Sequence, residues 1–495
     1  MTDIPLLGLA GLRRLPAASR PLLSPGSVGT GIVHLGLGAF HRAHQAVYTE
    51  EAVAAAGGDW GIVGVAPRSR DVVAALAAQD SLFSVTTLSG AGSSTRVIGA
   101  LSGVRHAAAD PGAVVTLLAD PAVRVVTLTV TEKGYRLHPA TGRLLVDDDL
   151  CADLTTDRPP CTVPGLLVRG LIARYRSGAG PVALLSCDNL PANGHRLGSL
   201  VDQALRRIRP GVGDDLLDWV GGNVTFPGSM VDRIVPATTP RTLAAAATAL
   251  GARDLAAVAA EPYRQWVVED DFPGGRPAWE KAGVVLTDDA RPWERLKLRT
   301  LNGVHSAIAY LGALAGCETV ADALRLPGLH DAMCRFIAED VAHSLMPPAG
   351  VDVVQYGDEV LERFANPAIA HRTVQVAMDG SQKLPQRVLH TIEARRAAGA
   401  VPRWGALVVA AWIRFAQGAA DDGRPLPLDD PLAAEIRSRL AAAPGTPDGA
   451  VAAMFGLAAV FPAELAADAV LRAQVSEWLT AFDRHGVAAT LAGLR

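Results

Sequence analysis

The sequence predicts an α/β fold for its N-terminal part and a mostly α-helical domain for its C-terminal part. Before about residue 290, short β-rich runs alternate with alanine-rich helical stretches, which is typical of βαβ units and a mostly parallel sheet. After about residue 293 the β signal fades, and apolar residues recur at helical spacing. A segment rich in proline and glycine, residues 272–277, lies between the two patterns. We therefore expect one domain over residues 1–285 and a second over residues 286–495.

Length and composition agree with two folded domains and exclude several other classes of protein. The chain has 495 residues, 49% of them apolar and 19% charged, so it can build more than one core and is not intrinsically disordered. A net charge of -4 without a basic stripe argues against nucleic acid as a partner. The apolar runs stop well short of the roughly 20 residues that cross a membrane, and no secretion signal is evident. Five scattered cysteines form no C-x-x-C pair, so we expect reduced thiols, a cytoplasmic location and no metal site.

The residue pattern also predicts the individual elements. In the N-terminal part we expect strands at residues 31–35, 60–65, 123–130 and 182–186, and helices at 40–56, 71–79 and 194–208. Residues 84–101 are typical of a hairpin, which would be an antiparallel insertion into the α/β pattern. In the C-terminal part we expect helices at residues 296–314, 321–326, 330–343, 383–398, 404–416, 432–442 and 470–482.

A glycine loop follows the first expected strand. In a dinucleotide site, the first glycine of such a loop allows a tight turn, and the second lets the backbone approach a pyrophosphate at a helix N-terminus. Here His41 stands where a third glycine would complete the pattern, and Arg42 supplies a charge for phosphate. The same Gly-x-Gly spacing also occurs in tight turns that bind nothing. The candidate cofactor-binding residues of this loop are Gly36, Leu37, Gly38, Ala39, Phe40, His41 and Arg42.

The end of the second expected strand bears on which dinucleotide would bind. In NAD-binding proteins of this kind, an acid about twenty residues after the glycines binds the ribose. Here the strand runs into Arg68 and Asp71, with no acid at the strand tip itself. Asp71 is a ribose candidate that also suits a helix cap, and Arg68 tolerates the 2′-phosphate of NADP. NAD and NADP therefore both stay open at this point.

The segment from Lys297 to His305 carries the strongest local chemistry. On an α-helix of about 100° per residue, Asn302 lies about 140° and His305 about 80° around the axis from Lys297. Leu301 and Ile308 fall close to Lys297, which predicts a buried lysine with a lowered pKa. A neutral amine can take a hydroxyl proton, an amide can donate to the developing alkoxide and an imidazole can orient the hydroxyl, so the set suits alcohol oxidation. The same segment also fits an amphipathic helix with a snorkelling lysine and a core histidine.

Further polar candidates stand at strand ends or beside the lysine. Thr131, Glu132 and Lys133 follow the strand expected at 123–130, and Asn189 and Asn193 follow the strand expected at 182–186. Ligands bind at the carboxyl ends of parallel strands, although both loops also suit plain turns. Two carboxylates complete the set, and each also fits an ordinary ion pair: Asp232, which can bind a polyol hydroxyl, and Glu294, which can relay the released proton.

Together these motifs resemble the mannitol dehydrogenase family, the polyol-specific long-chain dehydrogenases and reductases. The most specific stretch is residues 224–236, VTFPGSMVDRIVP. Supporting stretches, in chain order, are IVHLGLGAFHRAH, VTLTVTEKGY, LLSCDNLPANG, EPYRQWVVEDDF and the segment from Lys297 to His305. The resemblance covers nearly the whole chain, from Ile32 to beyond Arg387. It implies a Rossmann-type N-terminal domain, a largely helical C-terminal domain and metal-free catalysis between them, normally with NAD.

The resemblance also implies a role for each catalytic and substrate-binding candidate. Carried over by position, Lys297 is the general base in oxidation and the general acid in reduction, and Glu294 lines the proton path. Asn302 and Asn193 form the oxyanion hole, with Asn189 as the alternative to Asn193. His305 and Asp232 contact substrate hydroxyls, and Lys383 contacts the far end of the substrate.

One departure from the family pattern bears on the substrate. Mannitol-specific members of the family that this chain resembles carry arginine at the position eight residues before Lys383, where this chain has Gln375. Gln375 and the Lys-Leu-Pro-Gln-Arg ending at 383–387 resemble fructuronate reductases, also named D-mannonate oxidoreductases. A uronate needs a cation for its carboxylate, and Arg372 or Lys383 could supply it. The expected reaction is therefore reversible hydride transfer between NAD(H) and a linear six-carbon substrate, with mannonate and fructuronate ahead of mannitol and fructose.

Three alternatives remain at this stage. Lys383 can also serve an uncharged polyol by hydrogen bonding, as in a mannitol 2-dehydrogenase. A mannitol-1-phosphate 5-dehydrogenase would need further cations, for which Arg372 and Arg387 are available. A non-catalytic nucleotide- or sugar-binding module would bind NADH without turnover. The expected partner is a small polyol or sugar acid, and the expected assembly is a monomer or a weak homo-oligomer.

Overall fold

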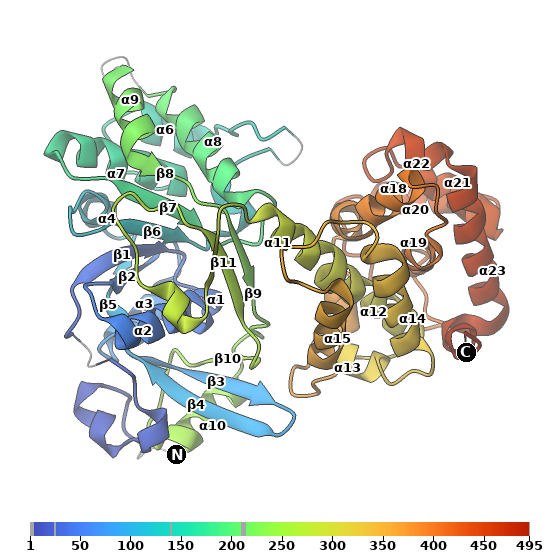
Figure 1. Ribbon diagram of the computed structural model, residues 1–495, viewed down its shortest axis with the longest axis horizontal. Helices are drawn as coiled ribbons and strands as arrows, with labels where there is room; N and C mark the ends of the chain where they lie inside the picture. The colour runs from blue at the N-terminus through green and yellow to red at the C-terminus, as the bar shows by residue number, and fades with distance from the viewer. Residues whose placement is uncertain (1–3, 24–25, 139–140, 209–213, 495) are drawn as a thin grey trace. The chain divides into compact units, whose positions relative to one another are not determined.

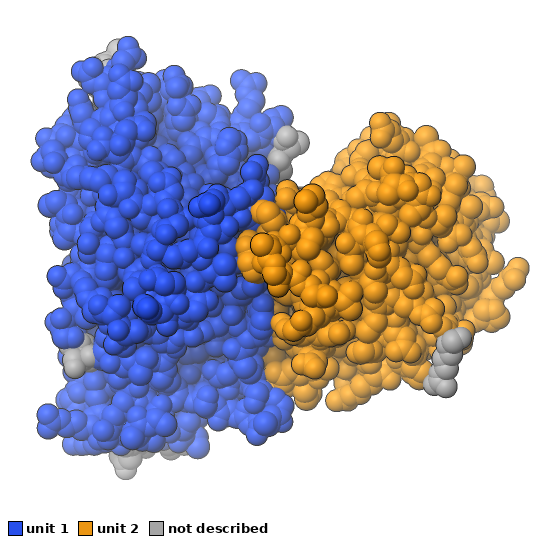
Figure 2. All heavy atoms as spheres, viewed as in Figure 1, with its two compact units in different colours: residues 1–291 blue, residues 292–495 orange. Residues whose placement is uncertain are grey.

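The computed structural model describes residues 4–23, 26–138, 141–208 and 214–494. The chain divides into two compact units, residues 1–291 and 292–495, which Figure 2 shows in different colours. We refer to them as the N-terminal and the C-terminal unit. Figure 1 labels their helices and strands.

The main sheet of the N-terminal unit is parallel and six-stranded. Its strands are β1 (Thr30–Leu35), β2 (Gly61–Ala66), β5 (Leu101–His106), β6 (Val125–Leu128), β7 (Val182–Ser186) and β8 (Val224–Thr225). Their spatial order, β5-β2-β1-β6-β7-β8, is the 3-2-1-4-5-6 order of a Rossmann fold when the strands are renumbered along the chain. The order reverses between β1 and β6, and ligands of such sheets bind at the carboxyl ends of strands at that switch point.

Helices cover both faces of this sheet, so its strands are buried on both sides. The helices of the unit are α1 (Ala39–Ala43), α2 (Gln45–Ala56), α3 (Arg70–Ala77), α4 (Pro111–Leu118), α5 (Thr131–Tyr135), α6 (Asp148–Thr155), α7 (Val163–Ser177), α8 (Asn193–Leu205), α9 (Asp214–Asn223) and α10 (Pro240–Leu250). Successive residues of β1 enter two different cores, Val33 the one that contains α4, α7 and α8, and Ile32 the one that contains α2. This double coverage explains why the strands read as continuous apolar runs.

Two three-stranded sheets complete the unit. The first contains β3 (Phe83–Ser89), β4 (Gly92–Ile98) and β10 (Val258–Ala260), and the second β9 (Ser229–Asp232), β11 (Gln265–Glu269) and β12 (Val285–Thr287). The expected hairpin is confirmed, because β3 and β4 pair antiparallel. Residue 101, which was expected to end that hairpin, instead begins β5 of the main sheet.

The C-terminal unit is helical. Its helices are α11 (Arg291–Lys297), α12 (Gly303–Leu314), α13 (Val320–Ala323), α14 (Leu329–Arg335), α15 (Val353–Phe364), α16 (Thr373–Val376), α17 (Gly380–Leu384), α18 (His390–Ala397), α19 (Arg403–Ala416), α20 (Ala433–Ala442), α21 (Pro447–Phe455), α22 (Ala463–Ala467) and α23 (Ala469–Ala492). At its centre α12 packs against α13, α16 and α19, and nearly every residue of α12 and α19 is buried.

Three of the expected long helices contain a π-helical stretch. These stretches are Leu298–Asn302, Phe336–Val341 and Pro385–Leu389. In a π turn the N–H group bonds the carbonyl five residues earlier instead of four, as Gly303 does with Leu298. The helices expected at 296–314, 330–343 and 383–398 are therefore present, but each is wider at one turn than an α-helix. π turns of this kind are frequent at functional sites.

Candidate active site

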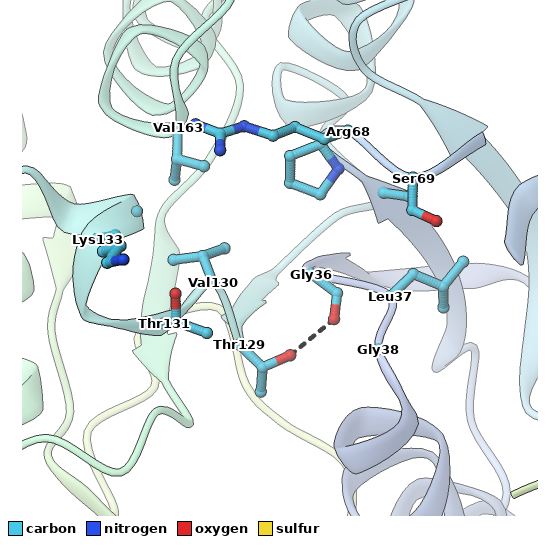
Figure 3. Close-up of a pocket in the computed structure, with 13 residues that line it drawn as sticks. Gly36, Leu37, Gly38, Arg68, Ser69, Thr129, Val130, Thr131, Lys133 and Val163 are labelled. Atoms are coloured by element: carbon cyan, nitrogen blue, oxygen red, sulfur yellow. Dashed lines mark hydrogen bonds between the residues drawn. The ribbon is translucent and has the colours of Figure 1, made fainter. Parts of the chain in front are cut away.

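A pocket of about 360 Å³ opens at the switch point of the main sheet, between the turn after β1 and the turn after β6 (Figure 3). The residues that line it are Gly36, Leu37, Gly38, Ala66, Pro67, Arg68, Ser69, Thr129, Val130, Thr131, Lys133, Gly134 and Val163. Six of these were cofactor candidates from the sequence: Gly36, Leu37, Gly38, Arg68, Thr131 and Lys133. The others were missed, although Ala66, Pro67, Ser69, Thr129, Val130 and Gly134 adjoin those candidates in the chain and follow the same strand ends.

Gly36 makes the tight turn that opens the pocket. Its φ of +109° lies in the left-handed region, and a Cβ atom there would stand 2.0 Å from the Thr129 carbonyl oxygen. Thr129 Oγ1 donates to the Gly36 carbonyl at 2.7 Å, as Figure 3 shows. At Gly38 the nearest atom to a Cβ would be 3.7 Å away, so the second glycine leaves open space. This arrangement fits a dinucleotide phosphate, because backbone can approach it closely there.

The charges at this pocket suit phosphate groups. Arg68 and Lys133 line it, and the described lining includes no aspartate or glutamate. Asp71 lies in the first turn of α3, exposed, and Glu132 is exposed in α5; neither belongs to the described lining. The pocket therefore offers two cations and no carboxylate to a bound nucleotide.

His41 and Arg42, which the sequence suggested as cofactor contacts, are buried and lie outside the described lining of the pocket. The His41 ring stacks on that of His34, with ring centroids 3.4 Å apart. Arg42 donates through Nη1 to the Leu37 carbonyl at 3.1 Å, so it braces the loop backbone. Ala39 and Phe40 are half-buried and are not among the lining residues either.

Asn193 begins α8 with its side-chain amide already engaged. Its Nδ2 donates to the carbonyls of Asp188 at 3.0 Å and Ser229 at 2.8 Å, and its Oδ1 accepts from the Ser229 N–H at 3.0 Å. Asn193 therefore ties the β7 end to β9. Asn189, the alternative from the same loop, is exposed.

Asp188 and Asp232 are the buried carboxylates of this region. Asp188 accepts hydrogen bonds from the backbone N–H groups of Val130 and Thr131 and from the Tyr135 hydroxyl, and thereby holds the turn after β6. Asp232 is 5% exposed at the end of β9.

In the C-terminal unit, the π turn brings two of the expected catalytic side chains toward one face. Lys297 ends α11 and Asn302 ends the π stretch, and they are 5% and 6% exposed. The angle of about 140° expected between them on an α-helix is wrong. Because the π turn bonds residues five apart, residues i and i+5 lie one turn above each other. The lysine burial expected from Leu301 and Ile308 is confirmed.

Three buried polar atoms of residues 297–305 have no hydrogen-bond partner within the described part of the chain. They are Thr300 Oγ1, Asn302 Nδ2 and His305 Nε2. The His305 ring stacks between Phe364 and His371, at centroid distances of 4.5 and 5.4 Å. Burial lowers the pKa of His305 well below 6.5, and nearby positive groups, among them His371 and Arg387, lower it further. The imidazole is therefore neutral at physiological pH and ready to bond a ligand hydroxyl.

The remaining candidates of this unit differ in their surroundings. Glu294 is half-buried in α11, three residues before Lys297. Lys383 donates to the carbonyls of Met378 at 2.5 Å and Val376 at 3.4 Å. Arg372 is exposed at the N-terminus of α16.

Metal and membrane features were also sought. No cluster of three or more His, Cys, Asp or Glu side chains suited to a metal ion is found in the described ranges. Among those same residues, every helix is too short or too polar to span a bilayer.

Comparisons with known proteins match both units. The model of the mannitol dehydrogenase Rossmann domain matches residues 30–281, and that of the mannitol dehydrogenase C-terminal domain matches residues 289–483. The D-mannonate oxidoreductase of Escherichia coli (strain K12) is 40% identical over 91% of this chain and 92% of its own length. The mannitol 2-dehydrogenase of Cereibacter sphaeroides is 36% identical over 96% and 97%. A solved ternary complex of Pseudomonas fluorescens mannitol 2-dehydrogenase with NAD and D-mannitol has a TM-score of 0.84 at 33% identity, covering 99% of both chains. The chain therefore belongs to the mannitol dehydrogenase family of oxidoreductases.

Proposed function

We propose that this protein is an NAD-dependent oxidoreductase that moves a hydride between the cofactor and a secondary carbinol of a linear six-carbon substrate. D-mannonate and D-fructuronate are its preferred pair, ahead of D-mannitol and D-fructose. The observation that carries the proposal is the π turn at Leu298–Asn302, which stacks a buried amine and an open amide on one face. A secondary alcohol needs those two groups at its oxygen.

The pocket after β1 and β6 would hold the dinucleotide. Gly36 and Gly38 leave room for the pyrophosphate, and Arg68 and Lys133 supply positive charge. When bound, NAD accepts the hydride in oxidation and NADH returns it in reduction. The protein's part is to orient the substrate and to handle the proton.

The proton would be handled by Lys297. As a neutral amine it takes the hydroxyl proton in oxidation, and as an ammonium it returns a proton in reduction. Asn302 Nδ2 donates to the oxygen that becomes negative, and the neutral His305 bonds a neighbouring hydroxyl through Nε2. Glu294 passes the proton on, and Asp232 binds a further hydroxyl. Because the Asn193 amide is already engaged, we assign the oxyanion contact to Asn302 first.

The preference for a sugar acid rests on Gln375 and on the positive side chains of the C-terminal unit. Gln375 stands where mannitol-specific relatives are expected to carry arginine. The 40% identity to a D-mannonate oxidoreductase supports the same ordering, against 36% to a mannitol 2-dehydrogenase. A phosphorylated substrate is less well supported, because the exposed Arg372 adds no charge to a buried site.

The test is a panel of reductions followed by the loss of NADH absorbance. Purified protein is offered fructuronate, fructose and fructose 6-phosphate, each with NADH and with NADPH. We expect fructuronate to give the highest kcat/KM, and a higher value for fructose would reverse the order of substrates. NADH binding without turnover on any of them would instead indicate a binding module.

The matched variants are Lys297→Ala and Lys281→Ala. Lys297→Ala should lower turnover by about 10²–10⁴-fold, the usual contribution of general acid–base catalysis, and leave NADH binding intact. Lys281 is an exposed lysine of the N-terminal unit, so its variant should keep full activity. Turnover of Lys297→Ala at the wild-type rate would remove the mechanism.

A further inference from the structure

Arg387 lies against the start of α12, the helix that carries His305 and that follows the π stretch ending at Asn302. The π stretch that contains Arg387 packs closely on this helix, because a Cβ atom at Gly303 would stand 2.8 Å from the Arg387 carbonyl oxygen. Arg387 Nη1 donates to Ser306 Oγ at 3.0 Å and lies 3.5 Å from the carbonyl oxygen of Asn302. The guanidinium therefore contacts Ser306, which follows His305 directly, and lies near the carbonyl of Asn302, three residues before His305.

This guanidinium has no carboxylate partner. Within the described ranges no aspartate or glutamate lies at ion-pair distance from Arg387. The Asp379 carboxylate, whose charge raises the pKa of Arg387, lies 3.9 Å from the Lys383 ammonium instead. Burial lowers the pKa of Arg387 to about 10, so the group stays charged at neutral pH. The side chain is half-buried, so its charge loses part of its hydration with no carboxylate to compensate for it. Arg387 is thus a cation that is ready for an anion.

Three other cations of the C-terminal unit already have partners or are exposed. Lys383 gives its ammonium protons to two backbone carbonyls and faces Asp379. Arg299 donates to the carbonyl of Ser344. Arg372, which the sequence suggested as a carboxylate ligand, is exposed.

We propose that Arg387 binds the carboxylate of a sugar-acid substrate and thereby selects it over a neutral sugar. The inference rests on the proposed function, and it names the residue that sets the substrate class. Besides the contacts of Nη1, the guanidinium makes no hydrogen bond within the described chain. Its remaining N–H groups can therefore donate two parallel hydrogen bonds to a carboxylate. A neutral hexitol would leave this half-buried charge without an anionic partner.

The alternative is that Arg387 has a purely structural role and only stabilises the start of α12 through Ser306 and the Asn302 carbonyl. The two roles differ in one readout. Loss of a brace would harm every substrate alike, whereas loss of a carboxylate ligand would harm only the acid. The ratio of kcat/KM for fructuronate to kcat/KM for fructose therefore separates them.

The experiment measures this ratio for the full-length protein and for Arg387→Met, Arg387→Lys and Arg325→Met. We expect Arg387→Met to lower kcat/KM for fructuronate at least about tenfold, mainly through KM, since hydrogen bonds between charged groups are among the strongest in proteins. Reduction of fructose and binding of NADH should stay within about twofold of wild type, a span of less than 1 kcal/mol. Arg387→Lys keeps the charge without the planar fork and should fall between the two. Arg325 is exposed and paired with Asp322, so Arg325→Met is the control with an unchanged ratio.

The outcomes separate the inference from the proposed function. An equal loss on fructuronate and fructose in Arg387→Met would overturn the inference and leave the function in place. Should Arg387→Met fail to fold, an unchanged ratio in Arg387→Lys would overturn it as well. Wild-type protein that reduces fructose but not fructuronate would overturn both the substrate order and the inference. No reduction of either would overturn the proposed function itself.

Discussion

The imidazole rings of His34 and His41, which precede and follow the glycines of the loop in the chain, stack with their planes 10° apart. Both rings are fully buried. His34 Nδ1 pairs with Thr127 Oγ1 at 2.8 Å, and its Nε2 lies 2.9 Å from both the Gly36 carbonyl oxygen and Thr129 Oγ1. His34 thus joins the turn after β1 to the turn after β6, the two turns that open the pocket.

This pair should make the N-terminal unit sensitive to acid. Burial lowers the pKa of His34 from 6.5 to about 3, against the raising effect of its bond to Gly36, and burial lowers the pKa of His41 as well. Between about pH 6.5 and pH 3 the unfolded chain binds a proton at His34 that the folded protein does not. The free energy of unfolding therefore falls as the pH drops through this window and is retained above it, by about 2 kcal/mol from His34 alone between pH 6.5 and 5.

The measurement is thermal unfolding between pH 5 and 8 for wild type, His34→Gln and His330→Gln. His34→Gln should be less stable at pH 7.5 but should lose less stability on acidification. His330 is exposed, so its variant should follow the wild-type slope. A His34→Gln slope as steep as that of wild type would show that the stacked pair does not govern the acid response.

The two glycines of the loop should respond differently to alanine. Gly36→Ala would place a methyl group against the Thr129 carbonyl at a positive φ, which alone costs about 1–2 kcal/mol, so we expect a lower Tm and weaker NADH binding. Gly38→Ala has free space and an ordinary φ, so its Tm should match wild type. Because that methyl group would still occupy the surface that faces the pyrophosphate, NADH binding should weaken all the same. Fluorescence titration with NADH and a melting curve for each variant test both statements, and full NADH affinity in both variants would contradict them.

Asn302 should contribute to turnover through its open amide. Asn302→Ala should lower kcat by about 10²–10³-fold, the usual effect of removing one oxyanion donor, with a smaller change in KM. Thr300 in the same π stretch is the matched control, because its buried Oγ1 has no partner in the described chain and Thr300→Val removes a hydroxyl that bonds nothing. Steady-state kinetics of the two variants should therefore differ sharply. Similar losses in both would point to a general disturbance of the π turn.

Arg68 should affect the choice between dinucleotides. It lines the pocket at the end of β2, where an NAD-specific site usually presents a carboxylate to the ribose. We expect the protein to accept NADPH beside NADH, and Arg68→Ala to lower kcat/KM for NADPH roughly tenfold while changing that for NADH little. Equal effects on the two cofactors would mean that Arg68 does not contact the 2′-phosphate.

Much of the fold could be predicted because its signals are local. The alternation of apolar strands and helices predicted the parallel sheet, and the strand expected at 182–186 begins and ends where β7 does. The break at His44 in the helix expected at 40–56 could not be predicted, because those residues are compatible with one helix and only the tertiary setting gives His44 its φ of -127° and ψ of -87°. β5 was also missed, since Leu101–His106 follows a hairpin directly and carries no distinct strand pattern.

The sequence predicted which residues belong to the candidate site better than it predicted how they are arranged. Lys297, Asn302 and His305 were identified, but their mutual angle depended on an α-helix that the chain does not form there. A π turn leaves no residue signature, because it arises from how neighbouring segments pack. His41 and Arg42 were assigned to the cofactor only because they follow the glycines closely in the sequence. Sequence spacing cannot distinguish a side chain that faces a ligand from a buried one that stabilises the loop, as these two are.

The wide turn at Leu298–Asn302 also limits how this stretch can vary in length. Deleting one residue from it would let the backbone close into an ordinary helix, in which Lys297 and Asn302 would stand four residues apart and about 40° around the axis, still on one face. Keeping all the residues but losing the wide turn would instead part the amine and the amide by about 140°. One residue can therefore be removed here without turning the amine away from its amide neighbour, whereas a change that straightens the turn at the present length should abolish catalysis.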